Sequence, residues 1–267
     1  MHVPSDPLEQ FHVDRLPVSI YRDEDAVGEI AATRAAEIIE RAIAERGVAN
    51  VVFATGNSQS TYFKHLRRHQ SIDWPAVNLF MIDQYLGVDP LRRGTLVYLE
   101  AHLLGHVHPR SFHPISSSPG EAERMCDEYA ALLARHPLDL ASVGWGENGH
   151  LAFNDPHNAD FDDPAAMKVV ALSAESRRQP VSEGRFDSID EVPTHAITMT
   201  IPAILAAKRI LCIVPERRKA VAVRNCLRET ISTERPGSIL RRIDHAELLL
   251  DSESAANLDA AAFERRP

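Results

Sequence analysis

The loop from Gly144 to Pro156, which reads GWGENGHLAFNDP, holds residue types that can do acid–base chemistry. Three glycines allow its backbone to turn sharply and to approach a ligand closely. An imidazole follows at His150 and a carboxylate at Asp155, and a carboxylate near an imidazole orients the ring and tunes its basicity. With Asn148 beside them, these residues are candidate catalytic groups. The competing interpretation is a histidine that serves only the folding of the loop.

A second candidate catalytic residue is Asp83, which directly follows the apolar run Leu79 to Ile82. A carboxyl group at the end of a buried strand is partly desolvated, and desolvation raises its pKa toward the range that suits a general base. We therefore consider Asp83 a candidate for proton abstraction. The alternative is an aspartate that only caps the following turn.

Two further segments are suited to an anionic ligand. The segment Thr55-Gly56-Asn57-Ser58 lies between a predicted strand and a predicted helix, where backbone N–H groups and hydroxyls can bind an anion. It lacks the Lys-Ser/Thr ending of a nucleotide-binding loop, so nucleotide hydrolysis is not indicated. Lys219, near the start of another predicted helix, can supply a countercharge for a phosphate. The alternatives are a turn with a serine cap and a solvated surface lysine.

Two other patterns in the sequence do not predict a site. The spacing Gly144-x-Gly146-x-x-Gly149 matches the dinucleotide-binding fingerprint, but that fingerprint needs a helix that begins inside the glycines. Asn154-Asp155-Pro156 follows too soon for a regular helix, because proline removes a backbone donor and clashes with the preceding turn. Metal sites need several convergent ligands, and prolines break any helical face shared by four nearby histidines, so no metal is predicted. These histidines are His102, His106, His108 and His113.

Apolar runs and amphipathic stretches alternate along the chain and must position the candidate residues. A helix is predicted from about Asp23 to Gly47, and four more follow. Strand and helix in alternation predict an α/β fold with a largely parallel sheet covered on both faces. The predicted strands are Asn50 to Ala54, Asn78 to Ile82, Leu138 to Val143, Lys168 to Leu172, His195 to Met199, Arg209 to Val214 and Glu247 to Leu250. The later predicted helices are Ser60 to His69, Leu96 to Leu104, Gly120 to Arg135 and Arg217 to Arg228.

Residues 1–17 are expected to form a loose N-terminal arm, and residues 18–267 a single domain, because no linker or change in composition divides them. A parallel sheet gathers the carboxyl ends of its strands at one edge, and ligands bind at that edge. We therefore expect one site, built from the polar clusters that follow four of the predicted strands. These clusters are Thr55 to Ser60, Asp83 to Tyr85, the loop from Gly144, and Pro215 to Lys219.

The composition narrows the classes of function. The chain has 267 residues, of which 44% are hydrophobic and 25% charged, as in an ordinary globular protein. A formal net charge of −9 argues against nonspecific binding to nucleic acid, which needs a basic face. No apolar run approaches the ~18–20 residues of a membrane span, so no membrane association is predicted. The three cysteines are scattered and the N-terminus lacks a signal-peptide core, which favours the cytoplasm.

Several of these segments together resemble one family. The loop from Gly144 to Pro156 resembles the characteristic motif of the glucosamine-6-phosphate deaminases (isomerising). The run Phe80 to Gly87 looks like their second motif, and Thr55-Gly56-Asn57-Ser58 takes the place of their phosphate loop. The resemblance runs in the right order from about Val27 to Leu250 and covers most of the chain. The residues that look like the two phosphate-binding cations of the family are Arg185 and Lys219.

The resemblance implies a Rossmann-like three-layer α/β/α sandwich that needs neither a metal nor a redox cofactor. It also implies a small-molecule sugar phosphate as substrate: an amino-sugar 6-phosphate is converted to a keto-sugar phosphate and ammonia. By analogy, His150 opens the pyranose ring by moving a proton at the ring oxygen. Asp83 takes the proton from C2 and returns it at C1 through an enolamine. Asp155 orients His150.

Three positions depart from the family pattern. Asn148 stands where the family often has an aspartate, Gln84 replaces the second acid of an Asp-Glu-Tyr pattern, and Asp155 is one methylene shorter than the usual glutamate. Less negative charge therefore surrounds His150. The preferred sugar stays open between glucosamine 6-phosphate, galactosamine 6-phosphate and a modified sugar. A homo-oligomer is among the assemblies that the sequence leaves open.

Two other functions fit the same fold. The 6-phosphogluconolactonases share it, but their histidine is typically followed by a Thr/Ala-Ser-Leu-Phe-Pro run, whereas Ala-Phe-Asn-Asp-Pro occurs here and favours the deaminases. A non-enzymatic sugar-phosphate sensor is the other alternative. Such regulators carry a helix-turn-helix segment, for which only about 20 residues at each end are left once the α/β domain is assigned.

Overall fold

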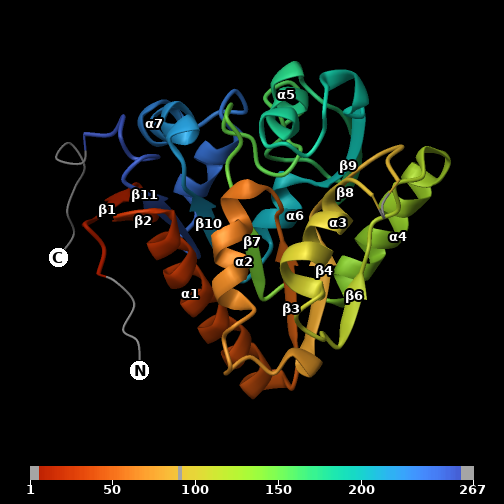
Figure 1. Ribbon diagram of the computed structural model, residues 1–267, viewed down its shortest axis with the longest axis horizontal. Helices are drawn as coiled ribbons and strands as arrows, with labels where there is room; N and C mark the ends of the chain where they lie inside the picture. The colour runs from red at the N-terminus through yellow and green to blue at the C-terminus, as the bar shows by residue number, and fades with distance from the viewer. Residues whose placement is uncertain (1–5, 90–91, 260–267) are drawn as a thin grey trace.

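The largest element of the protein is a sheet of eight strands. A computed structural model describes residues 6–89 and 92–259 (Figure 1). Every neighbouring pair of strands in the order β1-β2-β11-β10-β7-β3-β4-β6 is parallel except β1 with β2. The expected parallel α/β sheet is therefore confirmed. Its strands are β1 (Glu9–Val13), β2 (Leu16–Tyr21), β3 (Ala49–Phe53), β4 (Val77–Met81), β6 (Ser111–His113), β7 (Leu140–Val143), β10 (Arg209–Val214) and β11 (Ala246–Asp251).

The middle strands are apolar over nearly their whole length, which explains their place at the centre. Strands β3, β4 and β7 are buried at every residue, and β10 is buried after its first residue. A strand becomes a continuous buried run when both faces of its sheet are covered. Helices cover both faces, and Figure 1 shows α1 and α2 side by side across one of them. The architecture is the expected Rossmann-like three-layer α/β/α sandwich.

The longest helix, α1 (Glu24–Arg46), begins and ends as its sequence predicts. The side chain of Asp23 accepts a hydrogen bond from the backbone N–H of Ala26, and Gly47 ends the helix with a φ of 73°. None of the described helices is both long and apolar enough to cross a membrane. The other helices are α2 (Ser60–Leu66), α3 (Thr95–Leu99), α4 (Ala122–Arg135), α5 (Ala174–Ser182), α6 (Ile201–Leu205) and α7 (Ala220–Arg228).

The structure corrects the expectation of a loose arm over residues 1–17. Strands β1 and β2 form an antiparallel hairpin, and β2 continues the sheet by pairing in parallel with β11. Alternate residues of the hairpin are buried, which is the period-two pattern of a half-buried strand. The polar residues between them concealed this pattern. Residues 1–5 lie outside the described part. The alternating buried residues are Phe11, Val13, Leu16, Val18 and Ile20.

A second, antiparallel sheet of three strands lies above the carboxyl edge of the first (Figure 1). Its order is β5-β9-β8, so two strands expected in the main sheet belong here instead. One residue, Ile82, separates β4 from β5, and the first residue of β5, Asp83, lies opposite Thr198. The second sheet therefore holds Asp83 at the edge of the main sheet. Its strands are β5 (Asp83–Tyr85), β8 (Met167–Ala171) and β9 (His195–Met199).

Candidate active site

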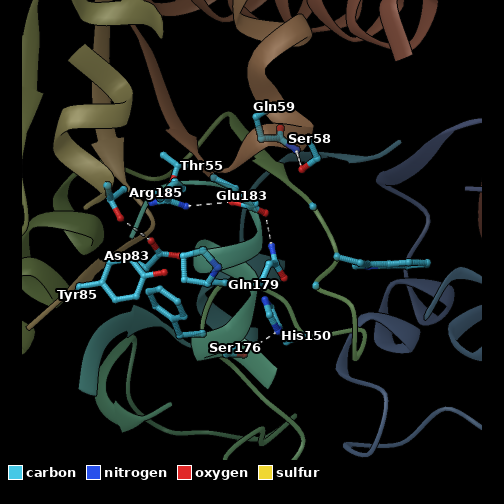
Figure 2. A pocket seen from close by; sticks show the side chains of 18 of the residues that line it. Thr55, Ser58, Gln59, Asp83, Tyr85, His150, Ser176, Gln179, Glu183 and Arg185 are labelled. Carbon is cyan, nitrogen blue, oxygen red and sulfur yellow. Dashed lines mark hydrogen bonds and ion pairs between the residues drawn. The ribbon is translucent and has the colours of Figure 1, made fainter. Parts of the chain in front are cut away.

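Four neighbouring strands of the main sheet, β10, β7, β3 and β4, direct the segments that follow them into one pocket (Figure 2). The pocket holds about 620 Å³ of empty space, its open mouth included. This is the convergence at the carboxyl edge that the sequence predicts. Six of the predicted site residues line the pocket: Thr55, Ser58, Asp83, His150, Arg185 and Lys219.

The imidazole of His150 is held on one side by a network of three polar side chains. Its Nδ1 lies 2.8 Å from Oδ1 of Asn148 and 3.2 Å from Oδ1 of Asp155. The amide of Asn148 donates to the same Asp155 oxygen at 2.9 Å. The hydroxyl of Ser176 donates to that oxygen at 2.6 Å and lies 3.2 Å from Nδ1. Asn148 and Asp155 do not line the pocket; they support the residue that does.

This network determines which ring nitrogen carries the proton. Because Nδ1 faces the acceptor oxygens of Asn148 and Asp155, it is the donor, and Nε2 of the neutral ring is left as a base. Asp155 is completely buried. Burial acts to raise the pKa of Asp155, but hydrogen bonds from His150, Ser176 and Asn148 outweigh burial and hold the pKa well below its usual range. The carboxylate therefore stays ionised and orients the imidazole.

The glycines of the loop make room for the histidine. A Cβ atom at Gly146 would lie 2.1 Å from Cε1 of His150, so the ring rests directly against the glycine backbone. Gly149 adopts a φ of 82°, the left-handed conformation in which glycine carries little strain. No helix begins within these glycines, which agrees with the rejection of the dinucleotide fingerprint.

Asp83 is buried and lines the same pocket. Its Oδ1 accepts a hydrogen bond from the hydroxyl of Thr95 at 3.2 Å. Burial raises the pKa of Asp83 to about 6, while the guanidinium of Arg185, the Thr95 hydroxyl and His150 act in the opposite direction. A carboxyl group with this pKa is mostly ionised at neutral pH and is a stronger base than an exposed aspartate. The environment expected for Asp83 is the one observed.

Two cations face the pocket, Lys219 fully buried and Arg185 partly buried. Lys219 is 1% exposed, and burial together with the neighbouring Arg218 lowers the pKa of Lys219 to about 8. The guanidinium of Arg185 lies 5.9 Å from the ring centre of Tyr85 and 5.7 Å from that of Tyr98. The Nη2 atom of Arg185 is buried and has no hydrogen-bond partner among the described residues. Such a donor in a pocket is suited to an anionic ligand.

The segment Thr55-Gly56-Asn57-Ser58 turns sharply between β3 and α2. Gly56 has a φ of 131°, and its carbonyl accepts a hydrogen bond from the hydroxyl of Tyr98 at 2.6 Å. Thr55 and Ser58 line the pocket, whereas Gly56 and Asn57 do not. The structure therefore places half of this segment at the pocket surface and uses the other half to shape the turn.

Sequence reasoning missed the contribution of α5, which supplies Ser176 and Gln179 to the pocket and is followed at once by Glu183. The helix is polar and contains Pro180, so it has no amphipathic pattern. The available signal was Ser173, whose side chain caps the helix by accepting from the N–H of Ser176.

The departure at Gln84 from the family pattern has a structural role. Gln84 is completely buried and does not line the pocket. Its Oε1 accepts from the backbone N–H of Tyr85 at 3.0 Å and of Thr95 at 3.3 Å. It therefore holds the start of α3, and through Thr95 it supports Asp83.

Within residues 6–89 and 92–259, no cluster of histidine, cysteine or acidic side chains suited to a metal ion occurs.

The fold and the pocket define a Rossmann-like α/β/α protein in which Asp83 and His150 share one pocket with the cations Lys219 and Arg185. The family model described as glucosamine-6-phosphate isomerases/6-phosphogluconolactonase matches residues 22–249, and the chain belongs to this family. The glucosamine-6-phosphate deaminase of Bacillus pumilus (strain SAFR-032) is 32% identical over 244 residues, which cover 88% of this chain and 97% of that protein. The resemblance to the deaminases is thereby confirmed.

Other similar proteins also belong to this family. The glucosamine-6-phosphate deaminase of Exiguobacterium sibiricum is 34% identical over 211 residues, or 78% of this chain and 81% of that protein. The solved structure of a monomeric glucosamine-6-phosphate deaminase superposes with a TM-score of 0.82 at 28% identity, covering 90% of this chain and 99% of that one. A 6-phosphogluconolactonase from Shewanella baltica OS155 gives a TM-score of 0.72 at 19% identity over 90% and 99% of the two chains, a likeness of fold alone.

Proposed function

We propose that this protein is a glucosamine-6-phosphate deaminase, which converts glucosamine 6-phosphate and water to fructose 6-phosphate and ammonia. The observation that carries the proposal is the single pocket shared by Asp83, the supported His150 and the cations Lys219 and Arg185. The curated deaminases at 32% and 34% identity support it. The solved lactonases are similar in fold alone and provide no comparable support.

His150 opens the sugar ring. Its Nε2 takes the proton of the C1 hydroxyl and delivers it to the ring oxygen as the bond between that oxygen and C1 breaks. The hydrogen bonds that Nδ1 donates keep Nε2 free for this transfer. Ionised Asp155 stabilises the imidazolium that forms in between, which is electrostatic assistance at the position where charge develops.

Asp83 then moves a proton between two adjacent carbons. It takes the proton from C2 of the open-chain amino aldehyde while the C1 oxygen is protonated, which gives an enolamine. It returns the proton to C1, so that an imine remains at C2, and water converts the imine to the ketone with release of ammonia. A pKa of about 6 leaves Asp83 ionised for the first step and able to return the proton in the second.

The phosphate of the substrate binds at the cationic part of the pocket. Lys219 and Arg185 supply charge-assisted hydrogen bonds, and the hydroxyls of Thr55 and Ser58 add neutral donors. Asn57 and Gly56 do not contact the phosphate in this proposal; they shape the turn that presents Thr55 and Ser58. A bound phosphate fixes the positions of C1 and C2 relative to Asp83 and His150. This positioning lowers the activation barrier of the proton transfers. We place the enzyme in the cytoplasm, in keeping with its three buried, unpaired cysteines.

An assay of ammonia release tests this proposal. The purified protein is incubated with glucosamine 6-phosphate, galactosamine 6-phosphate and unphosphorylated glucosamine, and in parallel with 6-phosphogluconolactone. We expect ammonia and fructose 6-phosphate from glucosamine 6-phosphate and no acceleration of lactone opening. Lactone hydrolysis without ammonia release from any amino sugar would assign the chain to the lactonases instead. Binding of the sugar phosphates without turnover would indicate a sensor.

A further inference from the structure

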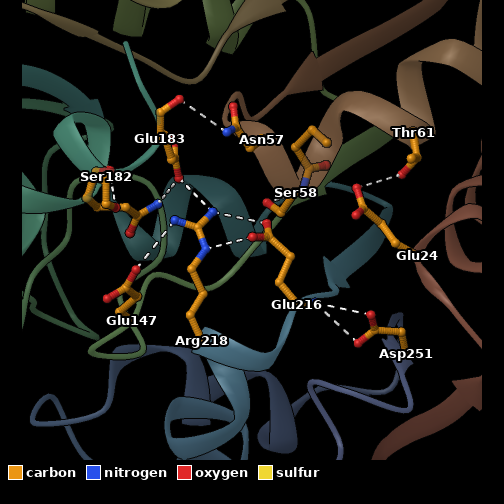
Figure 3. Close-up of polar contacts among 12 residues, drawn as sticks. Glu24, Asn57, Ser58, Thr61, Glu147, Ser182, Glu183, Glu216, Arg218 and Asp251 are labelled. Carbon is orange, nitrogen blue, oxygen red and sulfur yellow. Dashed lines mark hydrogen bonds and ion pairs between the residues drawn. The ribbon is translucent and has the colours of Figure 1, made fainter. Parts of the chain in front are cut away.

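A carboxylate occupies the cationic part of the pocket. Glu183 lines the pocket, and its side chain is 1% exposed. One oxygen, Oε1, lies 3.0 Å from Nη2 of Arg218 and accepts from the side-chain amide of Gln179 at 2.8 Å (Figure 3). The other oxygen, Oε2, lies 3.6 Å from Nη1 of Arg185. Glu183 therefore bridges the two arginines as an anion bound at the same place would.

The same carboxylate lies against the turn that precedes α2. A Cβ atom built on Gly56 would lie 3.9 Å from Oε2 of Glu183, which is van der Waals distance. The side chain of Asn57 donates to the backbone carbonyl of Glu183 at 3.3 Å, so the two segments are joined (Figure 3). The phosphate proposed above would enter between this turn, Arg185 and Lys219, and part of that space is already taken by Glu183.

Glu183 is ionised and incompletely partnered. Burial acts to raise the pKa of Glu183, but Arg185 first, and then Gln179, Arg218 and Lys219, lower it below its usual range. Its Oε2 and Nη2 of Arg185 are both buried without a hydrogen-bond partner among the described residues. A buried polar atom left unpaired costs free energy. The carboxylate thus neutralises the cations without satisfying all of their donors.

We propose that Glu183 is a specificity-determining residue, a built-in anion that competes with the phosphate of the substrate for the cations of the pocket. This inference rests on the proposed function. A phosphate carries more charge and more acceptor oxygens than a carboxylate, so it can displace Glu183 from Arg185. A weaker anion gains less from these cations and so does not offset the repulsion between like charges in one buried site.

Arg218 provides a place for the displaced carboxylate. It does not line the pocket, and it already pairs with Oε1 of Glu183. Glu183 can therefore keep this ion pair while its Oε2 leaves Arg185. Substrate binding is then an exchange of one anion for another, and part of the binding energy is used to move Glu183.

The test measures the binding of inorganic phosphate to the purified protein by titration calorimetry. Glu183→Gln removes the competing charge and should tighten phosphate binding by about tenfold or more, which corresponds to about 1.4 kcal/mol or more. The matched control is Glu147→Gln, which removes a carboxylate 3.4 Å from Nη1 of the same Arg218 but outside the pocket. The control should change phosphate affinity by less than about twofold, since a half-exposed ion pair contributes little.

A second variant guards against loss of folding in the first. Glu183→Asp keeps the charge near Arg218 but withdraws it by one methylene from Gly56, so phosphate should bind more tightly than to the parent and less tightly than to Glu183→Gln. Unchanged or weaker phosphate binding in both variants, with folding intact by thermal unfolding, would overturn the proposal. In kinetics with glucosamine 6-phosphate, the proposal requires a lower KM in Glu183→Gln.

The outcomes separate this inference from the proposed function. If the parent releases ammonia from glucosamine 6-phosphate but the Glu183 variants bind phosphate as it does, the competing role of Glu183 is wrong and the deaminase stands. If neither the parent nor Glu183→Gln binds phosphate or phosphorylated sugars, the phosphate site itself is wrong. If Glu183→Gln alone binds phosphate, the competition is real and the natural ligand carries a different anionic group.

Discussion

Oδ1 of Asp155 lies 3.2 Å from Nδ1 of His150, and the same oxygen also accepts hydrogen bonds from Ser176 and Asn148. Three donors therefore converge on one buried carboxylate oxygen, and none of these contacts involves Nε2 of the imidazole. The remaining oxygen, Oδ2, accepts from the backbone N–H of Ser173 at the start of α5. The orientation of His150 thus depends on both the glycine loop and α5.

Asp155→Asn should lower turnover sharply and leave phosphate binding nearly unchanged. An amide at this position removes the charge that stabilises the imidazolium and can present its NH₂ to Nδ1, which favours the wrong tautomer. Loss of such a supporting carboxylate typically costs about 10–100-fold or more in activity. The measurements are kcat with glucosamine 6-phosphate and the dissociation constant of inorganic phosphate. Parent-like kcat at every pH would show that Asp155 only supports the turn before Pro156.

Asn148→Asp should shift the acidic limb of the pH–rate profile to higher pH. The Asn148 amide lies 2.9 Å from Oδ1 of Asp155, so the variant places two carboxylates in contact beside the imidazole. The added negative charge favours the protonated imidazole. The control is Asn148→Ala, which removes the amide without adding charge and should lower kcat without that shift. An acidic limb at the same pH in parent and Asn148→Asp would contradict the expectation.

Asp83→Asn should keep the fold and substrate binding but lose turnover. The amide oxygen can still accept the hydrogen bond from Thr95, but it cannot take up the C2 proton. Removal of a general base typically costs ~10²–10⁴-fold in kcat. In the parent, kcat/KM should fall as the pH drops through about 6, because Asp83 becomes protonated there. Undiminished ammonia release by the variant would remove Asp83 from this role.

Asp83→Asn should also raise the free energy of unfolding at neutral pH. A carboxyl group whose folded pKa is raised above its unfolded value weakens the fold once it ionises, so the penalty is small at pH 4, close to the unfolded value of 3.8, and complete above about pH 6. A shift from 3.8 to about 6 corresponds to about 3 kcal/mol at most. Denaturant unfolding at pH 4 and pH 7 measures the difference in the free energy of unfolding between the parent and Asp83→Asn. Equal differences in stability at the two pH values would contradict the raised pKa of Asp83.

Lys219→Ala and Arg185→Ala should mainly raise KM for the phosphorylated substrate. Each loses a charge-assisted hydrogen bond, worth about 1.5–3 kcal/mol, or roughly 10–100-fold in KM. Because burial lowers the pKa of Lys219 to about 8, phosphate binding to the parent should weaken as the pH rises past that value. In Lys219→Ala, phosphate binding should not weaken in this pH range. Equal binding of glucosamine and its phosphate by the parent would rule out the phosphate site.

Part of the site could be predicted because it depends on local pattern. Buried apolar runs followed by polar turns located β3, β4, β7 and β10, and a parallel sheet must bring their carboxyl ends together. The raised pKa of Asp83 followed from its position at the end of such a run. Lys219 was found by its place at a helix start, but Arg185 was found only through the family resemblance.

Other features were decided by tertiary structure alone. Ser176 reaches Asp155 across 21 residues and Arg218 reaches Glu183 across 35, and no local pattern specifies which distant side chains meet. Strands β8 and β9 have ordinary strand sequences, and only their partners placed them in the small sheet.

The sequence by itself therefore determined the central strands, the parallel sheet and the edge at which the site forms, because hydrophobic periodicity and turn chemistry act over a few residues. Tertiary structure decided which nitrogen of His150 contacts Asn148 and Asp155 and that Glu183 lies between Arg185 and Arg218. Those outcomes depend on burial, which changes the free energy of a charge only once distant segments have excluded water from it.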